Sequence, residues 1–119
     1  MRTTFRFMNF QVYKDAKRLA TRIFRMTRVF PLEMRSQLTR SSQSIVLNIA
    51  EGSAKESDKD FNRYIQNSLG SVNETVAGLE LAKDFGLLKE KDLIMLMKEA
   101  ESIARQLGGL SKKLKMVKS

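Results

Sequence analysis

Apolar side chains recur at steps of three and four residues along four stretches of the chain, whereas short runs that alternate apolar and polar residues are absent. Because an α-helix has 3.6 residues per turn, this spacing places each apolar set on one helix face. The first stretch predicts a helix over residues 10–29. Its apolar face carries Val12, Ala16, Leu19, Ile23, Met26 and Phe30.

Three more helices are predicted over residues 32–51, 58–84 and 89–114. Pro31 suits a first helical position, and Ser57 with Asp60 resembles a capping box. Gly52 suits the left-handed residue that ends many helices, and Gly86 marks the end of the third helix. Connections of two to six residues make consecutive helices run antiparallel. The pattern therefore predicts an all-α fold, a single-domain, up-down-up-down four-helix bundle spanning residues 1–119.

Two helices carry a second row of similar side chains beside the apolar face, small ones in the third helix and polar ones in the second. In the third helix Ser71, Thr75, Gly78 and Ala82 are all small, so another helix backbone can approach closely. The second helix carries a polar row about 100° from its apolar face. The polar row consists of Gln37, Arg40, Ser44, Asn48 and Glu51.

The polar row has two interpretations. In the structural one, Ser44 and Asn48 bond to backbone or neighbouring helix groups, and Arg40 pairs with Glu51 or Glu74, because buried polar groups must find partners. In the functional one, Gln37, Arg40 and Asn48 line a concave surface for a phosphate or a partner peptide. We favour the structural interpretation.

The formal net charge of +9 is concentrated near the chain ends. Residues 1–40 hold ten Lys or Arg against two acids, whereas residues 41–111 hold eight basic and eleven acidic residues. Four lysines and no acid follow Ser111. Such asymmetry favours a polyanionic partner, because cations that neutralise phosphates release counterions; the alternative is a solvated charged face.

The candidate nucleic-acid contacts are basic residues of the first helix and of the C-terminal tail. The first set, here called the basic ridge, lies about 200° from the apolar face and should point away from the core. The ridge contains no aromatic residue, so we expect contacts to nucleic-acid backbones rather than base reading. The ridge consists of Lys14, Arg18, Arg22, Arg25 and Arg28, and the tail set of Lys112, Lys113, Lys115 and Lys118.

The residue inventory excludes most enzyme chemistry. The chain has no cysteine and no histidine, so thiolate and imidazole metal sites, disulfides and His general bases cannot form. No carboxylate or serine sits in a recognisable catalytic pattern, and no cofactor motif is present. We therefore expect no catalysis, metal or cofactor, and no small-molecule substrate.

No apolar run is long enough to cross a membrane, and the N-terminus lacks the apolar core of a signal peptide. These absences predict a cytoplasmic protein without membrane contact. In the fourth helix the run Leu93, Ile94, Met95, Leu96 and Met97 is apolar around more than a full turn. This surplus suggests a subunit interface at Leu93, Ile94 and Met95.

Several motifs together resemble a known family. "SIVLNIAEG" over residues 44–52 extends a pattern that includes Gln37, Arg40 and Ser41, and it is followed by Ser57, Asp60, Phe61 and by Gly70, Ser71, Glu74. The chain is similar to the four-helix bundle proteins encoded by intervening sequences in bacterial 23S ribosomal RNA genes, the S23 ribosomal protein family. Two departures are a Pro31-to-Gln37 gap about one turn shorter than usual and Lys89 at a usual capping serine.

The resemblance implies a bundle of largely unknown role. One related group, the accessory variability determinant of diversity-generating retroelements, is a basic homopentamer that associates with reverse transcriptase and nucleic acid. By resemblance we expect a homo-oligomer, a pentamer, whose partners are RNA or DNA and a protein such as a reverse transcriptase. The function expected is a non-enzymatic nucleic-acid-binding accessory protein; the alternative is a protein–protein interaction scaffold.

Overall fold

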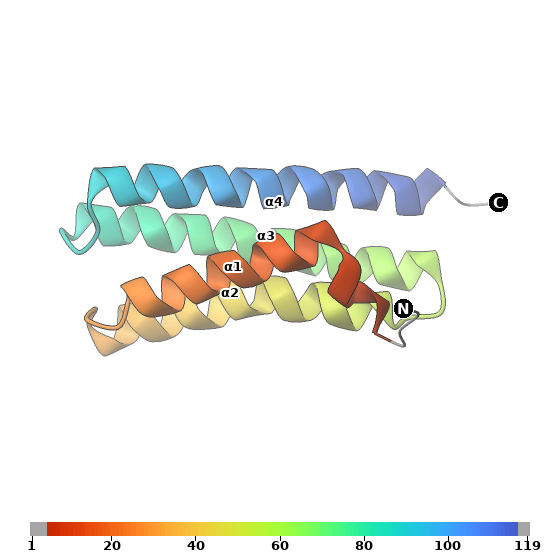
Figure 1. Ribbon diagram of the computed structural model, residues 1–119, viewed down its shortest axis with the longest axis horizontal. Coiled ribbons are helices and arrows are strands. Elements are labelled where there is room, and N and C mark those ends of the chain that lie inside the picture. Colours follow the sequence, from red (N-terminus) through yellow and green to blue (C-terminus); the bar gives the residue numbers. More distant parts are fainter. Residues whose placement is uncertain (1–4, 117–119) are drawn as a thin grey trace.

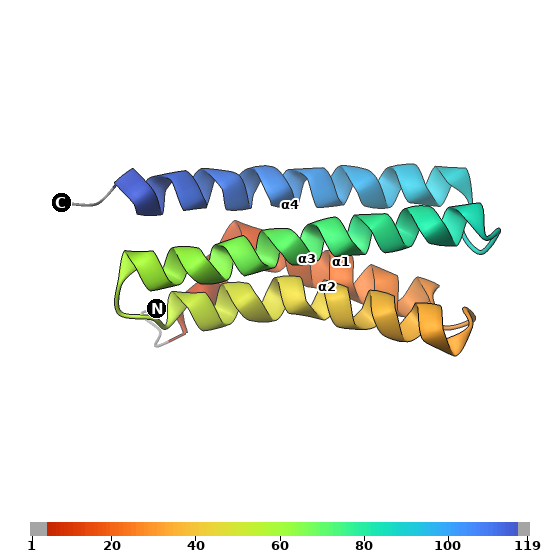
Figure 2. The same ribbon diagram turned by 180° about the vertical axis from the view of Figure 1, so that it is seen from behind.

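The computed structural model describes residues 5–116, which form four long helices after one short 3-10 turn (Figure 1). The elements are η1 Arg6–Asn9, α1 Gln11–Met26, α2 Leu32–Ser53, α3 Asp58–Asp84 and α4 Glu90–Met116. No strand occurs among these residues. Consecutive helices run antiparallel along the 50 Å long axis, and Figure 2 shows the same order from behind. The predicted all-α four-helix bundle is confirmed.

The four helices pack in chain order, with α4 closing against α1. α2 and α3 share the most extensive contact, whereas α1, the shortest of the four, contacts α4 least and crosses the bundle obliquely (Figure 1). The apolar face predicted for the first helix is buried at Val12, Ala16, Leu19 and Ile23. Those side chains meet Leu38, Ile45 and Ile49 of α2, Ile65 and Leu79 of α3, and Leu96, Ile103 and Leu107 of α4 in one core.

The helix ends follow several of the sequence signals. The Oγ atom of Ser57 accepts a 3.1 Å hydrogen bond from the Asp60 N–H, which is the predicted N-cap of α3. Gly86 has φ +81°, and the N–H of Leu87 donates to the Ala82 carbonyl at 2.9 Å. This Schellman geometry ends α3 where Gly86 was expected to end it. Pro31 precedes α2 instead of opening it, and α1 ends three residues before Val29.

The prediction that Gly52 ends the second helix in a left-handed conformation is wrong. Gly86 is the only glycine with positive φ among residues 5–116, and α2 continues to Ser53. Arg6 takes over the capping: its Nη2 and Nε atoms donate to the Ser53 carbonyl at 2.9 and 3.3 Å. A cation at a helix C-terminus satisfies a free carbonyl and the negative end of the dipole. α2 therefore needs no left-handed residue.

Gly52 instead allows α2 and α3 to approach each other. A Cβ atom placed on Gly52 would lie 2.7 Å from the Cβ of Tyr64 and 3.0 Å from Cδ1 of Phe61. Gly78 has the same role further along: its Cβ would lie 2.8 Å from Cδ2 of Leu38. The small row of α3 is buried here, as its composition predicted. Within residues 5–116 no helix is long and apolar enough to cross a membrane.

Candidate nucleic-acid interface

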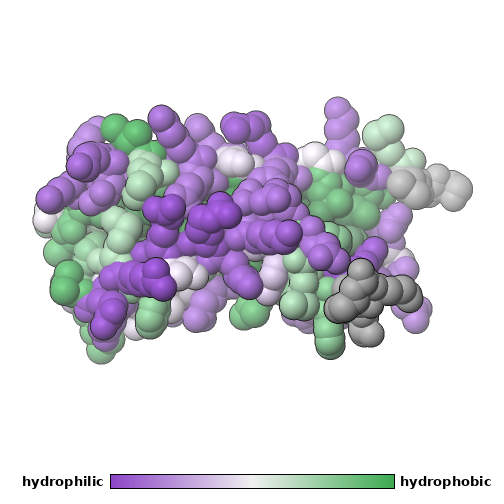
Figure 3. Space-filling model, in the orientation of Figure 1, coloured by the Kyte–Doolittle hydropathy of each residue, from purple (hydrophilic) through white to green (hydrophobic). Residues whose placement is uncertain are grey.

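The basic ridge lies on the outer face of α1. All five members, Lys14, Arg18, Arg22, Arg25 and Arg28, are exposed. Their exposure follows from the helical rotation that buries Ala16, Leu19 and Ile23 on the opposite side of α1. Figure 3 shows a hydrophilic band crossing the middle of the face on which α1 lies. The ridge is thus available to a partner from solvent.

Ion pairs divide the basic ridge into bound and free cations. Nη1 of Arg18 lies 3.3 Å from Oδ1 of Asp15, one turn away on α1. Nε of Arg22 lies 3.0 Å from Oε2 of Glu99 on α4. Lys14, Arg25 and Arg28 form no ion pair with any residue in the range 5–116. These three side chains therefore carry the uncompensated charge of the ridge.

Asp15, the single acidic residue of α1, joins the first helix to the last. Its Oδ2 accepts a 2.8 Å hydrogen bond from Nε2 of Gln106 on α4, and its Oδ1 accepts one of 2.9 Å from Nε2 of Gln11. Burial acts to raise the pKa of Asp15, but the bonds from Gln106 and Gln11 and the charge of Arg18 outweigh it. The pKa of Asp15 therefore lies below its ordinary value.

The tail lysines do not lie on one face. Lys113 lines a shallow hollow with Gln11 and Val12, so it extends the surface at the N-terminal end of α1. At 100° per residue, Lys112 and Lys115 are turned by about 100° and 160° from Lys113. They therefore face away from α1. Lys118 lies outside the described residues.

Part of the polar row of α2 belongs to a hydroxyl seam between α2 and α3. Oγ of Ser71 donates to Oγ of Ser44 at 2.7 Å, and Nδ2 of Asn48 donates to the Ser44 carbonyl at 2.9 Å. Oγ1 of Thr75 lies 2.9 Å from Oγ of Ser41. The seam consists of Ser41, Ser44, Ser68, Ser71 and Thr75. Buried hydroxyls that bond across a helix pair set its register, in line with the structural interpretation.

The other members of the polar row do not form the ion pairs that the structural interpretation expected. Nε2 of Gln37 donates to Oε2 of Glu74 at 3.2 Å. Arg40 is exposed and pairs with neither Glu51 nor Glu74, so the expected ion pair is wrong. The reason is rotational: Arg40 lines an open hollow on α2 that Arg35 and, from α1, Arg28 also line. Glu51 is also exposed.

The bundle buries only part of the apolar run of α4, and Ile94 and Met95 stay exposed. Leu93 packs partly buried against the core, and Met95 lies beside Arg22, with its sulfur 3.8 Å from Nη1. Ile94 remains 47% exposed. Whether these residues form an oligomer interface stays a prediction. Other exposed apolar side chains lie at the same end of the bundle, in its two helix turns and next to them, namely Phe24, Val29, Leu32, Leu81 and Phe85.

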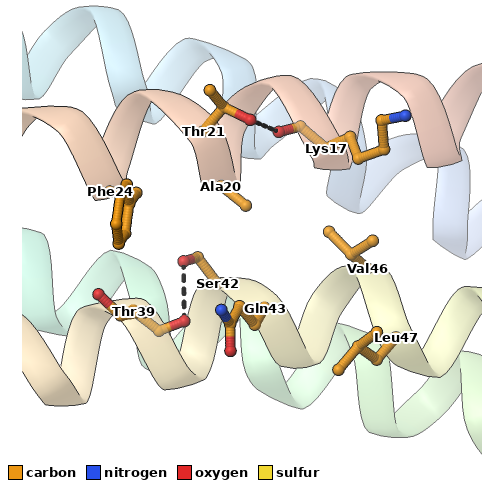
Figure 4. A pocket seen from close by; sticks show the side chains of 9 residues that line it. All are labelled: Lys17, Ala20, Thr21, Phe24, Thr39, Ser42, Gln43, Val46 and Leu47. Carbon is orange, nitrogen blue, oxygen red and sulfur yellow. Dashed lines mark hydrogen bonds between the residues drawn. The ribbon is translucent and has the colours of Figure 1, made fainter.

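Sequence reasoning did not find the groove between α1 and α2. Phe24 and Ala20 point from α1 toward α2, where Thr39, Ser42 and Gln43 lie (Figure 4). Phe24 is 55% exposed, although it follows the fully buried Ile23 directly. Its position off the apolar face, between Arg22 and Arg25, was the available signal. No sequence pattern indicated that Arg35 lines this groove, because only the packing of α2 against α1 brings it there.

The chain matches the model of the 23S rRNA-intervening sequence protein family over residues 8–109. It belongs to that family. A solved structure with the same fold is a protein of unknown function from the S23 ribosomal protein family of Bacteroides thetaiotaomicron. The two chains are 24% identical, the match covers 85% of this chain and 98% of the other, and the TM-score is 0.80. No curated protein matches the sequence.

The family membership confirms the resemblance drawn from "SIVLNIAEG". This 23S rRNA-intervening sequence protein has no group of three or more Asp or Glu residues placed to hold a metal ion within residues 5–116. Its most distinctive chemistry is the unpaired positive charge on α1 and along the neighbouring edge of α2. That charge is the basis for a functional assignment.

Proposed function

We propose that the protein is a non-enzymatic accessory protein that binds the backbone of RNA or DNA through the outer face of α1. The observation that carries the proposal is the composition of that face. Lys14, Arg25 and Arg28 are exposed without ion pairs in the described chain, and Asp15 is the single acid of α1. Cations so placed can neutralise phosphates and release condensed counterions.

The binding mode follows from the side chains. Guanidinium groups donate several N–H bonds to phosphate oxygens, and phosphate contacts position a protein without reading sequence. Arg18 and Arg22 can add to the contact by exchanging Asp15 and Glu99 for phosphate. Lys113 lies at one end of this surface and Arg28 at the other.

Salt dependence tests the proposal. We would measure fluorescence anisotropy of a labelled 20-mer, as single strand and as duplex, across a series of salt concentrations. If five phosphates are neutralised, log affinity falls with log salt at a slope of about −4.5 for duplex DNA. A variant with Lys14→Gln, Arg25→Gln and Arg28→Gln should flatten the slope by about 2.7.

The matched control removes the same net charge elsewhere. Lys59, Lys91 and Arg105 are exposed on α3 and α4 and form no ion pair within residues 5–116. Their triple replacement by Gln should change the slope by less than about one. If both triple variants flatten the slope equally, the salt dependence reflects the net charge of the protein and not the face of α1. An absence of binding to every oligonucleotide at low salt would contradict the proposal.

We also propose that the protein self-associates, as a pentamer by the family resemblance, and that a protein partner such as a reverse transcriptase can join it. Val29, Leu81 and Phe85 are exposed at the end of the bundle that holds the α1–α2 and α3–α4 turns, and they support an interface there, outside the groove between α1 and α2. Native mass spectrometry would show five chains. A monomer at micromolar concentration would contradict self-association.

The second candidate function is a protein–protein interaction scaffold. It draws on the same apolar end, where Leu81 and Phe85 are 49% and 62% exposed. In this case Leu81→Ser with Phe85→Ser should abolish partner capture, while oligonucleotides bind neither the parent nor the variant.

A further inference from the structure

Two adjoining hollows between α1 and α2 form one open trough. They share Phe24, Thr39 and Gln43. The apolar hollow, of about 520 Å³, is also lined by Ala20, Val46 and Leu47. The basic hollow, of about 640 Å³, is also lined by Arg28, Arg35 and Arg40. An apolar surface with one aromatic ring thus continues into a hollow that three arginines line.

The charge of the trough is uncompensated. No carboxylate lines either hollow. Arg28 and Arg40 form no ion pair within residues 5–116, and Nη1 of Arg35 donates only to the Arg28 carbonyl, at 3.4 Å. Three neighbouring like charges repel one another, so an anionic occupant would relieve a cost already present in the fold. This charge complementarity selects a polyanion for the basic hollow.

The apolar hollow restricts the polyanion further. Phe24 is 55% exposed and Leu47, at the other end of the apolar hollow, is 62% exposed, so a flat apolar group could cover the ring of Phe24 (Figure 4). Thr39 and Gln43 stand between the two hollows, and no described residue accepts or donates a hydrogen bond to the Gln43 side chain. A hydroxyl and an amide beside an aromatic ring can bond the edge of a base that stacks on the ring. An apolar peptide face would leave them unpaired.

We propose that the trough binds a single-stranded segment of nucleic acid, with a base stacked on Phe24 and the adjoining phosphates on Arg28, Arg35 and Arg40. This inference rests on the proposed backbone binding by α1 and adds a strand preference to it. In a duplex the base faces are stacked inside, so Phe24 could not reach them. Single strands leave those faces open.

The test compares one 20-mer DNA as single strand and as duplex with Phe24→Ala, Phe24→Trp and the pair Arg35→Gln with Arg40→Gln. Met116→Ala is the control, because Met116 is 73% exposed at the end of α4, outside the trough. Phe24→Ala should weaken single-strand binding about five- to thirty-fold and leave duplex binding within about twofold. The arginine pair should also weaken single-strand binding and flatten its salt slope by about 1.4.

Phe24→Trp keeps the ring and provides a direct signal. The chain has no tryptophan, so the introduced indole is the sole one. Single-strand DNA should retain its affinity for this variant and quench the indole fluorescence, and the duplex should not. This readout also serves if Phe24→Ala fails to fold, which circular dichroism would reveal.

The remaining outcomes overturn the inference in distinguishable ways. If Phe24→Ala weakens single strand and duplex equally, or neither, while the parent protein binds both, the trough assignment fails and backbone binding stands. If the parent protein binds no oligonucleotide in low salt, the proposed function fails as well. Binding of poly-L-glutamate that is lost in the Arg35 and Arg40 variant, without oligonucleotide binding, would make the trough a site for an acidic protein.

Discussion

Gln106 of α4 donates a 2.8 Å hydrogen bond to Asp15 of α1 across 91 residues of sequence. α1 and α4 share the smallest contact of the four neighbouring helix pairs. A bond that holds a carboxylate on α1 against α4 therefore matters more here than between α2 and α3. It also fixes α1, the helix on which the basic ridge lies.

Asp15→Asn should lower the free energy of unfolding at pH 7 by about 1 kcal/mol, the usual size of a hydrogen bond to a partly buried group. The pKa of Asp15 is lowered in the folded protein, so the unfolded chain binds its proton first as pH falls. This stabilisation is present above the ordinary pKa of about 4 and is lost as pH falls through the lower folded pKa.

Urea unfolding at pH 7 and at pH 2 to 3 measures this effect. The parent protein should lose more stability than Asp15→Asn between the two pH values. Glu56→Gln, which alters an exposed carboxylate in the α2–α3 turn, should follow the parent. Parallel losses in the parent and Asp15→Asn would show that Asp15 does not contribute.

Gly52→Ala should destabilise the protein by about 1 to 3 kcal/mol, as overpacking does. The added Cβ would lie 2.7 Å from the Cβ of Tyr64, so the backbones of α2 and α3 would have to separate. Gly108→Ala is the matched control. Outside the local helix backbone no atom lies within 4 Å of a Cβ placed there, so alanine should stabilise α4 by up to about 1 kcal/mol. Thermal unfolding of both variants would show whether each change in stability has the expected sign. Stabilisation by Gly52→Ala would refute the close approach of α2 and α3 at this position.

Asn48→Ala should cost about 1 kcal/mol of stability without changing oligonucleotide affinity. Nδ2 of Asn48 donates to the carbonyl and to Oγ of Ser44, at 2.9 and 3.0 Å, so its bonds serve α2 itself. Asn73→Ala, at an exposed position of α3, should change neither quantity. A loss of affinity at unchanged stability would revive the functional interpretation of the polar row.

Glu99→Gln should tighten oligonucleotide binding about two- to fivefold at low salt. It releases Arg22, whose Nε lies 3.0 Å from Oε2 of Glu99, and the exposed ion pair itself is worth at most about 1 kcal/mol. Glu101→Gln removes the same charge on the side of α4 that faces α3 and should have a smaller effect. Equal tightening by both variants, measured by anisotropy, would assign the gain to net charge.

The bounds of α3 were predicted without error, because Ser57 and Gly86 act within a few residues of the ends they define. Gly52 was misinterpreted for the converse reason. The group that caps α2 is Arg6, 47 residues away from Ser53, and the atoms that exclude a side chain at Gly52 belong to α3. A local sequence pattern carries no information on a distant capping group or on the atoms of a neighbouring helix.

The sequence alone determined that the chain forms four helices, which faces they bury and that the arginines of the first helix point outward. These properties depend on a 3.6-residue period and on capping groups a few residues apart. Only the tertiary structure decided that Glu99 holds Arg22, and that Arg35 and Arg40 join Arg28 beside Phe24. Such pairings depend on the rotation and crossing angle of whole helices. Sequences with the same periodicity can differ in both, so the periodicity does not determine the pairings.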